Sequence, residues 1–352
     1  MPLPPPPIAP PLLAWYDTHK RTLPWRGAQD PYKIWVSEIM LQQTRVAAVI
    51  PYYHRWMEAL PDVAALSAVE EDQLMKLWEG LGYYRRARNL QKAAKVIMDD
   101  FGGLFPRTYE TLLTLPGVGD YTAGAVASIA FHEPVPAVDG NVLRIAARLS
   151  ALRDDVMDPA VRKRVRAMVC AVLPPERPGA FNQALMDLGA TVCLPHGAPL
   201  CVQCPLSDLC AARADGTAEE LPVRKKKPPR RVEELTVYLL LSQNRVALRR
   251  REAGGLLGGL WEFPHVPGTL DEAEAGAPLA AWGLRPIDWQ RRMTAKHIFT
   301  HVEWRMTGYF VEVQGTGEGL TFAEKGELAR YAIPSAFGKF LGEIEAKLGI
   351  RS

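Results

Sequence analysis

The sequence LPGVGDYTAGAVA at residues 115–127 decides the fold of this chain. Gly117 and Gly119 flank a single valine directly before a run of residues that suits a helix. Glycine can adopt positive φ and leaves the backbone N–H groups uncovered, and such groups at a helix N-terminus bind anions without a charged side chain. The hairpin is therefore either a phosphate site or only a tight corner between two helices.

Helix signals dominate the chain up to about residue 211. Asp30 followed by Pro31 is typical of an N-cap and a first helical residue, which predicts a helix over residues 30–44. Proline and glycine boundaries predict further helices before residue 103, and others at residues 108–114, 120–131, 140–150, 158–173 and 179–192. We therefore expect a mostly α catalytic region of eight or more helices over residues 1–211.

The pattern changes after this region. Residues 212–231 form a charged, proline-containing linker with a basic end. Apolar residues then recur with a period of two, which predicts strands at residues 234–241, 245–250 and 302–313, with Gln243 and Asn244 turning the first into the second. With a closing helix at residues 334–348, we expect a smaller α+β domain over residues 232–352.

The composition is that of a globular chain of two or three domains, with 352 residues, 48% hydrophobic and 23% charged. No apolar run reaches the ~18 residues of a membrane span. The start of the chain lacks the pattern of a signal peptide, so we expect a cytoplasmic protein.

The net charge is only +3, and basic clusters suit either a polyanionic partner or solvated helix faces. These clusters are Arg85, Arg86, Arg88, Lys92 and Lys95, then Arg162, Lys163, Arg164 and Arg166, then residues 224–231.

Four of the five cysteines lie in one short stretch, with the spacing Cys193-x7-Cys201-x2-Cys204-x5-Cys210. Clustered cysteines in a cytoplasmic chain indicate metal binding rather than disulfides. Structural zinc sites usually show two short cysteine pairs, whereas this stretch has one, so the spacing favours an iron–sulfur cluster over zinc. We expect the fifth cysteine, Cys170, to be a buried apolar residue.

A carboxylate lies among apolar residues in PYKIWVSEIMLQQT. Glu38 has Ile34, Trp35 and Leu41 three or four positions away, and burial among them would raise its pKa, as a general acid requires. The alternative is an exposed glutamate on the opposite side of the helix, which periodicity alone slightly favours. The buried face would then consist of Val36, Ile39, Met40 and Gln43.

A second carboxylate, Asp139 in PVPAVDGNVLRIAARL, stands between an extended stretch and a helix. Such a residue is either a simple N-cap or an ionised carboxylate that points into a cleft, where Asn141 could hydrogen-bond to it. One buried acid and one ionised carboxylate form the pair that cleaves bonds to an anomeric carbon.

Taken together, these features resemble the helix-hairpin-helix DNA glycosylases with an iron–sulfur cluster. Among them the chain is most similar to the adenine glycosylase family, which removes adenine mispaired with 8-oxoguanine or guanine. The resemblance covers nearly the whole chain. It rests on LPWR at 23–26, SEIMLQQT at 37–44, WEGLGYYRRARNL at 78–90, LPGVGDYTAGAVAS at 115–128, AVDGNV at 137–142 and FNQALMDLGATVC at 181–193.

The resemblance implies catalytic roles. Glu38 would protonate adenine N7 and later activate water. Asp139 would stabilise or trap the deoxyribosyl centre, supported by Tyr121 and Asn141. Because the adenine must be flipped out of the duplex, side chains must replace the lost stacking. The remaining implied residues are Gln43 and Tyr83 entering the duplex with Leu81 and Gly82 shaping the loop, Trp25, Arg26 and Gln183 lining the adenine pocket, Gly117 and Gly119 holding phosphate, and Cys193, Cys201, Cys204 and Cys210 holding a 4Fe-4S cluster.

The C-terminal domain resembles the Nudix-like fold with which this family recognises 8-oxoguanine. Its recognition loop would be Phe299, Thr300 and His301, where the family has Phe-Ser-His, so the hydroxyl is retained. No R-E-x-x-E-E metal box follows GGLWEFP, and nucleotide hydrolysis is therefore not expected. The x7 spacing after Cys193 also departs from the family's x6, which one inserted loop residue can absorb.

The expected partner is duplex DNA with an A:8-oxoguanine or A:G mispair, bound by a monomer in the bacterial cytoplasm without membrane contact. The rival activities are a pyrimidine-specific glycosylase/lyase, a thymine-mismatch glycosylase and a non-catalytic DNA-binding protein. A lyase needs an amine for a Schiff base, and relatives with that activity have lysine where this chain has Tyr121. A thymine-mismatch enzyme would not need the C-terminal domain, and a non-catalytic protein would not need Glu38 and Asp139.

Overall fold

The computed structural model describes residues 7–27, 29–225 and 228–349, which group into two compact units. The first unit contains the chain up to Ala68 and from Arg88 to the linker. The second contains Val69–Ala87 and the chain after the linker. Lys226 and Lys227 of the predicted basic linker lie outside the described residues. Among the described residues, no helix is long and apolar enough to span a membrane.

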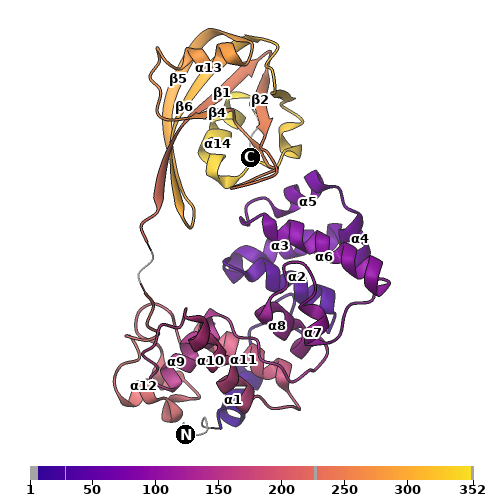
Figure 1. Ribbon diagram of the computed structural model, residues 1–352, viewed down its shortest axis with the longest axis vertical. Coiled ribbons are helices and arrows are strands. Elements are labelled where there is room, and N and C mark those ends of the chain that lie inside the picture. Colours follow the sequence, from indigo (N-terminus) through magenta and orange to yellow (C-terminus); the bar gives the residue numbers. More distant parts are fainter. Residues whose placement is uncertain (1–6, 28, 226–227, 350–352) are drawn as a thin grey trace. The chain divides into compact units, whose positions relative to one another are not determined.

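The described part of the first unit is helical, as predicted (Figure 1). Asp30 caps the second helix by accepting from the Tyr32 N–H at 3.0 Å, and Pro31 stands at its first turn, but the helix ends at Leu41 rather than Thr44. The helices are α1 (Ala9–His19), α2 (Pro31–Leu41), α3 (Val46–Ala59), α4 (Val63–Ala68), α6 (Arg85–Phe101, which begins in the second unit), α7 (Tyr109–Leu112), α8 (Asp120–Ala130), α9 (Gly140–Leu149), α10 (Pro159–Val172), α11 (Pro178–Thr191) and α12 (Ala211–Ala214), with short 3-10 helices η1 (Cys201–Gln203) and η2 (Ser207–Leu209).

Cys170 is exposed, so the prediction that it is buried was wrong. The buried face of α10 is a stripe of valines, Val161, Val165 and Val169, at four-residue spacing. Cys170 follows the last of them by one position, and one residue turns a helix by about a quarter of a circle. Its side chain therefore lies outside the apolar stripe.

The second unit contains a mixed sheet with the strand order β3-β2-β1-β6-β5 (Figure 1). The Gln243–Asn244 turn is confirmed: both residues have positive φ, 47° and 63°, between antiparallel β1 and β2. The elements are α5 (Glu71–Trp78), β1 (Arg231–Ser242), β2 (Arg245–Arg250), β3 (Trp261–Glu262), β4 (His265–Pro267), α13 (Gly276–Ala281), β5 (Leu284–Ile298), β6 (Val302–Gly315), β7 (Thr321–Glu324), η3 (Leu328–Arg330), η4 (Ser335–Phe337) and α14 (Gly338–Lys347).

Strand β5 was not predicted, yet it positions a predicted site. It pairs antiparallel with β6 over nearly its whole length, from Leu284↔Gly315 to Ile298↔Glu303. Residues 299–301 form the turn of this hairpin, which the Phe299 N–H closes by donating to the Val302 carbonyl at 2.8 Å. Strand β5 occupies a sheet edge and is exposed along most of its length, so its sequence lacks an apolar alternation.

Helix α14 packs closely on β6 because Gly308 has no side chain. A Cβ on Gly308 would lie 2.4 Å from the Phe340 ring, and Phe340 is fully buried in the core of this unit. Phe337 and Ile344 complete the contact from the same segment. The predicted closing helix therefore forms, and the glycine at position 308 allows it to pack closely on the sheet.

Gly308→Ala should destabilise the protein by roughly 1–3 kcal/mol, because the added methyl overpacks the contact with Phe340. Thermal unfolding followed by circular dichroism measures the change. Gly326→Ala is the matched control, since a Cβ there would meet no atom within 4 Å. Equal melting temperatures for the two variants would contradict the packing argument.

Candidate active site

Glu38 lies on the buried helix α2 with only 5% of its surface exposed. Every residue of that helix from Ile34 to Met40 is buried, so neither side of it faces solvent. The alternative of an exposed glutamate was therefore wrong. Periodicity failed here because a helix surrounded by other elements shows no single apolar face.

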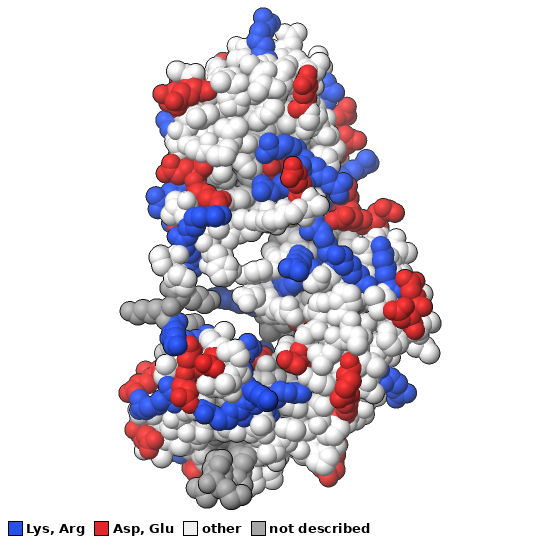
Figure 2. All heavy atoms as spheres, in the orientation of Figure 1, with Lys and Arg blue, Asp and Glu red and all other residues white. Residues whose placement is uncertain are grey.

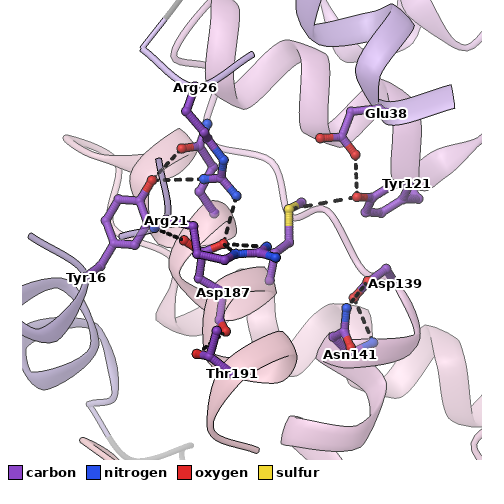
Figure 3. A network of polar contacts seen from close by, with 11 residues as sticks. Tyr16, Arg21, Arg26, Glu38, Tyr121, Asp139, Asn141, Asp187 and Thr191 are labelled. Atoms are coloured by element: carbon purple, nitrogen blue, oxygen red, sulfur yellow. Dashed lines mark hydrogen bonds and ion pairs between the residues drawn. The ribbon is translucent and has the colours of Figure 1, made fainter. Parts of the chain in front are cut away.

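The Tyr121 hydroxyl donates a hydrogen bond of 2.5 Å to Glu38 Oε2 (Figure 3). Burial raises the pKa of the Glu38 carboxyl; the bond from Tyr121 and the charge of Arg26 oppose this shift, and the charge of Asp139 adds to it. Burial also raises the pKa of Tyr121 well above 10.0, with Glu38 and Asp139 contributing. The site thus holds a carboxyl that keeps its proton more readily than an exposed glutamate does.

The glycine hairpin immediately precedes α8, which carries Tyr121. Gly117 adopts φ 78°, and a Cβ there would lie 2.6 Å from the Asn89 Cβ, so both its conformation and its surroundings require glycine. Gly119 differs from expectation: its φ is −104°, an ordinary value, and a Cβ there would meet nothing within 4 Å. No side chain caps α8, because Gly119 is its N-cap residue. The first amides of α8 are consequently accessible to an external anion.

Asp139 is the N-cap of α9, and its side chain is fully engaged (Figure 3). Its Oδ1 accepts from the N–H groups of Asn141 and Val142 at 2.9 and 2.8 Å, and its Oδ2 accepts from Asn141 Nδ2 at 2.8 Å. Burial raises the pKa of Asp139, while these three donors lower it. The N-cap interpretation is thus confirmed, and three N–H groups orient the carboxylate. The interpretation of Asp139 as an ionised carboxylate that points into a cleft stays a prediction.

Arg144 holds Asn141 in place. Its guanidinium donates to Asn141 Oδ1 at 2.9 Å, to the Gly189 carbonyl at 2.7 Å and to the Cys193 carbonyl at 2.8 Å. A Cβ on Gly189 would lie 2.5 Å from the Asn141 Cβ, so α11 and α9 meet closely at this point. Asp139 is thus connected through two side chains to the start of the cysteine stretch.

A second network surrounds Asp187, which is fully buried and which the sequence analysis did not single out (Figure 3). Arg21 and Arg26 both pair with its Oδ1, at 2.7 and 3.0 Å. Arg26 also donates to the Tyr16 hydroxyl at 2.9 Å, and Tyr16 donates to Gln183 at 2.5 Å. The available signal was a lone acid in the apolar helix sequence FNQALMDLGATVC, because a buried carboxylate requires cationic partners.

The residues predicted for the adenine pocket fall into two groups. Arg26 and Gln183 belong to the Asp187 network, and the charge of Arg26 reaches Glu38 and Tyr121. Trp25 is buried and packs edge-on against Tyr53, with ring centroids 5.2 Å apart. Arg26 thus belongs to the Asp187 network and acts on Glu38 and Tyr121 only through its charge, while Trp25 lies in the core.

The four clustered cysteines line one pocket together with apolar side chains and Arg148. Arg148 Nη1 lies 3.2 Å from Cys193 Sγ. Burial raises the pKa of Cys204 to about 11, and the charges of the other three thiols add to this shift. Among the described residues, no three His, Cys, Asp or Glu side chains are grouped closely enough to hold one metal ion.

The two ends of the x7 loop that follows Cys193 lie side by side, since the Leu200 N–H donates to the Val192 carbonyl at 2.9 Å.

The residues predicted to enter the duplex share an unusual backbone. Gln43 and Tyr83 both have positive φ, 64° and 47°, although neither is glycine, and both are exposed. Such conformations cost about 1 kcal/mol or more and are concentrated at functional sites. Gly82, in the left-handed region at φ 70°, precedes Tyr83, and Leu81 is buried beneath the loop.

The predicted recognition loop lies in the second unit together with Tyr83. Phe299 packs on Trp304 at 4.9 Å between ring centroids, while Thr300 and His301 are exposed. Thr300 Oγ1 and the Tyr83 hydroxyl are 2.5 Å apart. Two predicted DNA-contacting segments, separated by more than two hundred residues, therefore meet within one unit.

Basic side chains gather in several groups on the face shown in Figure 2, with acidic side chains between them. On α10, Arg162, Lys163 and Arg164 are exposed. Arg86 is different: it is buried, and its guanidinium donates to the carbonyls of Leu81 and Gly82. One member of the predicted basic cluster on α6, Arg86, therefore binds the protein's own backbone and does not form part of an exposed basic surface.

Comparison with known proteins shows the family to which the chain belongs. Residues 36–169 match the family model of the HhH-GPD superfamily base excision DNA repair proteins, and residues 236–343 match the NUDIX domain model. A solved thermostable thymine-DNA glycosylase is 30% identical with a TM-score of 0.52, covering 58% of this chain and 94% of that one. A non-covalent endonuclease III–DNA complex is 27% identical with a TM-score of 0.50, covering 58% and 92%. The matched family model and the glycosylase relatives place the chain among the DNA glycosylases, hydrolases that act on N-glycosyl bonds.

The curated relatives identify the branch of that class. Adenine DNA glycosylase of Mus musculus is 39% identical over 83% of this chain and 68% of the relative. The Homo sapiens protein is 38% identical over 86% and 66%, and the Schizosaccharomyces pombe protein is 34% identical over 83% and 78%. The chain thus spans about two thirds of the length of the mammalian relatives. It belongs to the adenine DNA glycosylase family.

Asp187→Asn should destabilise the protein by about 3 kcal/mol, because it leaves two arginines facing a buried neutral amide. Denaturant unfolding measures the loss. The control is Asp17→Asn, which breaks the exposed pair with Arg177 and should cost no more than about 1 kcal/mol. Similar losses for the two variants would show that burial of the Asp187 network has no special importance.

Proposed function

We propose that this protein hydrolyses the N-glycosidic bond of adenine mispaired with 8-oxoguanine or guanine in duplex DNA. The observation that carries the proposal is the buried Glu38, bonded to Tyr121 and within electrostatic reach of Asp139. Cleavage at an anomeric carbon uses a carboxylic acid and a second carboxylate, and these two residues supply the two carboxyl groups. The family resemblance supplies the substrate.

Glu38 is the proposed general acid. Its raised pKa keeps the carboxyl protonated closer to neutral pH, so that it can donate a proton to adenine N7 and make the base a better leaving group. After the base has left, the resulting carboxylate accepts a proton from the attacking water. The acceptance of a hydrogen bond from Tyr121 stabilises that carboxylate.

Asp139 is the proposed stabiliser of the sugar cation. The deoxyribosyl centre becomes positively charged as the bond breaks, and a fixed carboxylate stabilises or captures it. Asn141 orients Asp139 through its amide, and Arg144 orients Asn141. Because Tyr121 supplies a phenol and no amine, we infer that the enzyme leaves an abasic site without cutting the strand.

The DNA contacts that we propose are divided between two kinds of residue. The hairpin of Gly117 and Gly119 binds a backbone phosphate at the start of α8, where a Cβ on Gly119 would face open space. Gln43 and Tyr83 enter the duplex from strained, exposed positions, with Leu81 beneath the Tyr83 loop. This insertion offsets the stacking lost when the adenine is flipped.

The other assignments follow the same family pattern. Arg26, Gln183 and Trp25 form the adenine pocket, and Phe299, Thr300 and His301 read the base opposite adenine. We propose that the enzyme acts as a monomer in the bacterial cytoplasm.

We also propose that Cys193, Cys201, Cys204 and Cys210 hold a 4Fe-4S cluster. The donor set fits, because four thiols line one apolar pocket. Each thiolate of such a cluster binds a different iron, which suits four cysteines that are not close enough to share one ion. When bound, the cluster supplies a rigid cross-link for the 193–210 stretch. Arg148 beside Cys193 would balance its thiolate charge.

Glu38→Gln should lower the single-turnover rate of adenine release from an A:8-oxoguanine duplex by at least about 100-fold, since the amide cannot act as the acid. Duplexes with G:T or an oxidised pyrimidine test the rival activities and should not be processed by the wild type. Undiminished release by the variant would disprove the role of Glu38. Preferential release of thymine would instead support the thymine-mismatch activity.

Tyr121→Phe should move the alkaline limb of the pH–rate profile to higher pH. The hydroxyl stabilises the ionised carboxylate, so its removal raises the pKa of Glu38 further, and the protonated acid survives to higher pH. The limb position, rather than the maximal rate, is the decisive quantity. A shift to lower pH would contradict the assigned direction.

The purified protein should contain about four irons per chain and show the brown colour of an iron–sulfur cluster. Cys204→Ser should lose iron, whereas Cys170→Ser, which lies outside the cluster, should retain it. Iron and zinc analysis of the three proteins measures this. One zinc per chain and no iron would support the zinc alternative.

A further inference from the structure

Two distant segments of the second unit are joined by a closed set of polar contacts at the end of α5. Lys76 Nζ donates to the Tyr331 carbonyl at 3.2 Å, and Glu79 Oε1 accepts from the Ile333 N–H at 2.8 Å. Lys76 Nζ and Glu79 Oε2 are themselves 2.5 Å apart. One ion pair therefore holds both a carbonyl and an N–H of the same backbone segment, an arrangement that we call the Lys76–Glu79 clasp.

The segment held by the clasp is fixed in the core of the unit. Ala332 and Ile333 are buried, and the Ala332 carbonyl accepts from the Trp261 N–H at 3.2 Å. The Tyr331 ring packs edge-on against Trp261, with centroids 4.8 Å apart. The clasp therefore attaches α5 to a rigid part of the structure rather than to a loose loop.

Glu79 directly precedes the loop that carries Tyr83. The Gly82 carbonyl accepts from Trp78 Nε1 at 3.0 Å and from Arg86 at 3.1 Å, and the Leu81 carbonyl accepts from Arg86 at 2.9 Å. These hydrogen bonds make the loop rigid. Its orientation therefore depends on the position of the C-terminal end of α5, from which the loop begins. The clasp fixes that helix end.

The tip of the loop meets the recognition hairpin. The Tyr83 hydroxyl is 2.5 Å from Thr300 Oγ1, at the turn between β5 and β6. That contact alone is a weak constraint, because Tyr83 is 50% exposed and Thr300 is also exposed. A second attachment at the base of the loop is needed to keep the Tyr83 loop at a fixed distance from residues 299–301.

We propose that Lys76 and Glu79 are positioning residues that set the enzyme's preference for the base opposite adenine. The inference rests on the proposed function and extends it: the clasp holds the Tyr83 loop at a fixed place relative to residues 299–301. Two segments that contact the same base pair can discriminate between 8-oxoguanine and guanine only if the distance between the segments is fixed. Loss of the clasp should therefore weaken recognition of 8-oxoguanine while leaving the chemistry of adenine release intact.

The test compares single-turnover adenine release from A:8-oxoguanine and A:G duplexes by the full-length protein. Glu79→Ala and Lys76→Met should lower the rate ratio of the two substrates by about fivefold or more, mainly through the A:8-oxoguanine rate. Glu79→Gln should lose less, since its amide oxygen can still accept from the Ile333 N–H. Asp72→Asn is the control, because Asp72 lies at the far end of α5 from the clasp and forms an exposed pair with Arg250 of β2, so its loss should leave the ratio unchanged.

Hydrogen exchange gives a readout that does not depend on activity. Glu79→Ala should speed amide exchange in peptides covering residues 80–84 and 331–333 without lowering the global melting temperature. Unchanged exchange and an unchanged rate ratio would overturn the inference. If the wild type shows no preference for 8-oxoguanine, the proposed function fails along with the specificity role, whereas exchange still decides whether the clasp holds the loop.

Discussion

The burial of one carboxyl group, that of Glu38, is the constraint on which the proposed active site depends. A carboxylate in a dry site is costly unless donors or cations compensate for its lost hydration. Here the compensation is partial: one short hydrogen bond from Tyr121 and the more distant charge of Arg26. The result is a carboxyl group with a raised pKa, which is the property required of the general acid that we propose Glu38 to be.

The neighbouring elements also hold Asp139, the second carboxyl group of the proposed site, in place. The segment before Asp139 is fixed by Asn182, whose Oδ1 accepts from the Ala137 N–H at 3.1 Å. It also packs directly on α8, where a Cβ on Gly124 would lie 2.4 Å from the Pro136 carbonyl. Helix α8 thus positions Tyr121 against Glu38, and it also packs against the chain segment that precedes Asp139. The hairpin at its start, which looked ambiguous in sequence, places this whole helix.

The sequence predicted the features that depend on local chemistry. The N-cap at Asp30, the left-handed turn at Gln243 and Asn244 and the helical first region follow from side chains acting on their own backbone. Features set by long-range packing were not predictable. Glu38 is buried because other elements surround α2, β5 lacks an apolar alternation because it lies at a sheet edge, and Asp187 requires partners from far along the chain. Gly119 shows the same limit, because a Cβ there would meet no atom of the described residues within 4 Å and its φ is ordinary.

The burial of Glu38 raises the pKa of its carboxyl group, and a direct titration measures this shift. Infrared difference spectra with 13C-labelled glutamate, recorded for the wild type and Glu38→Gln, isolate the carboxyl signal of this residue. We expect a pKa above the ordinary value of 4.5. A carboxyl that titrates at or below that value would contradict it.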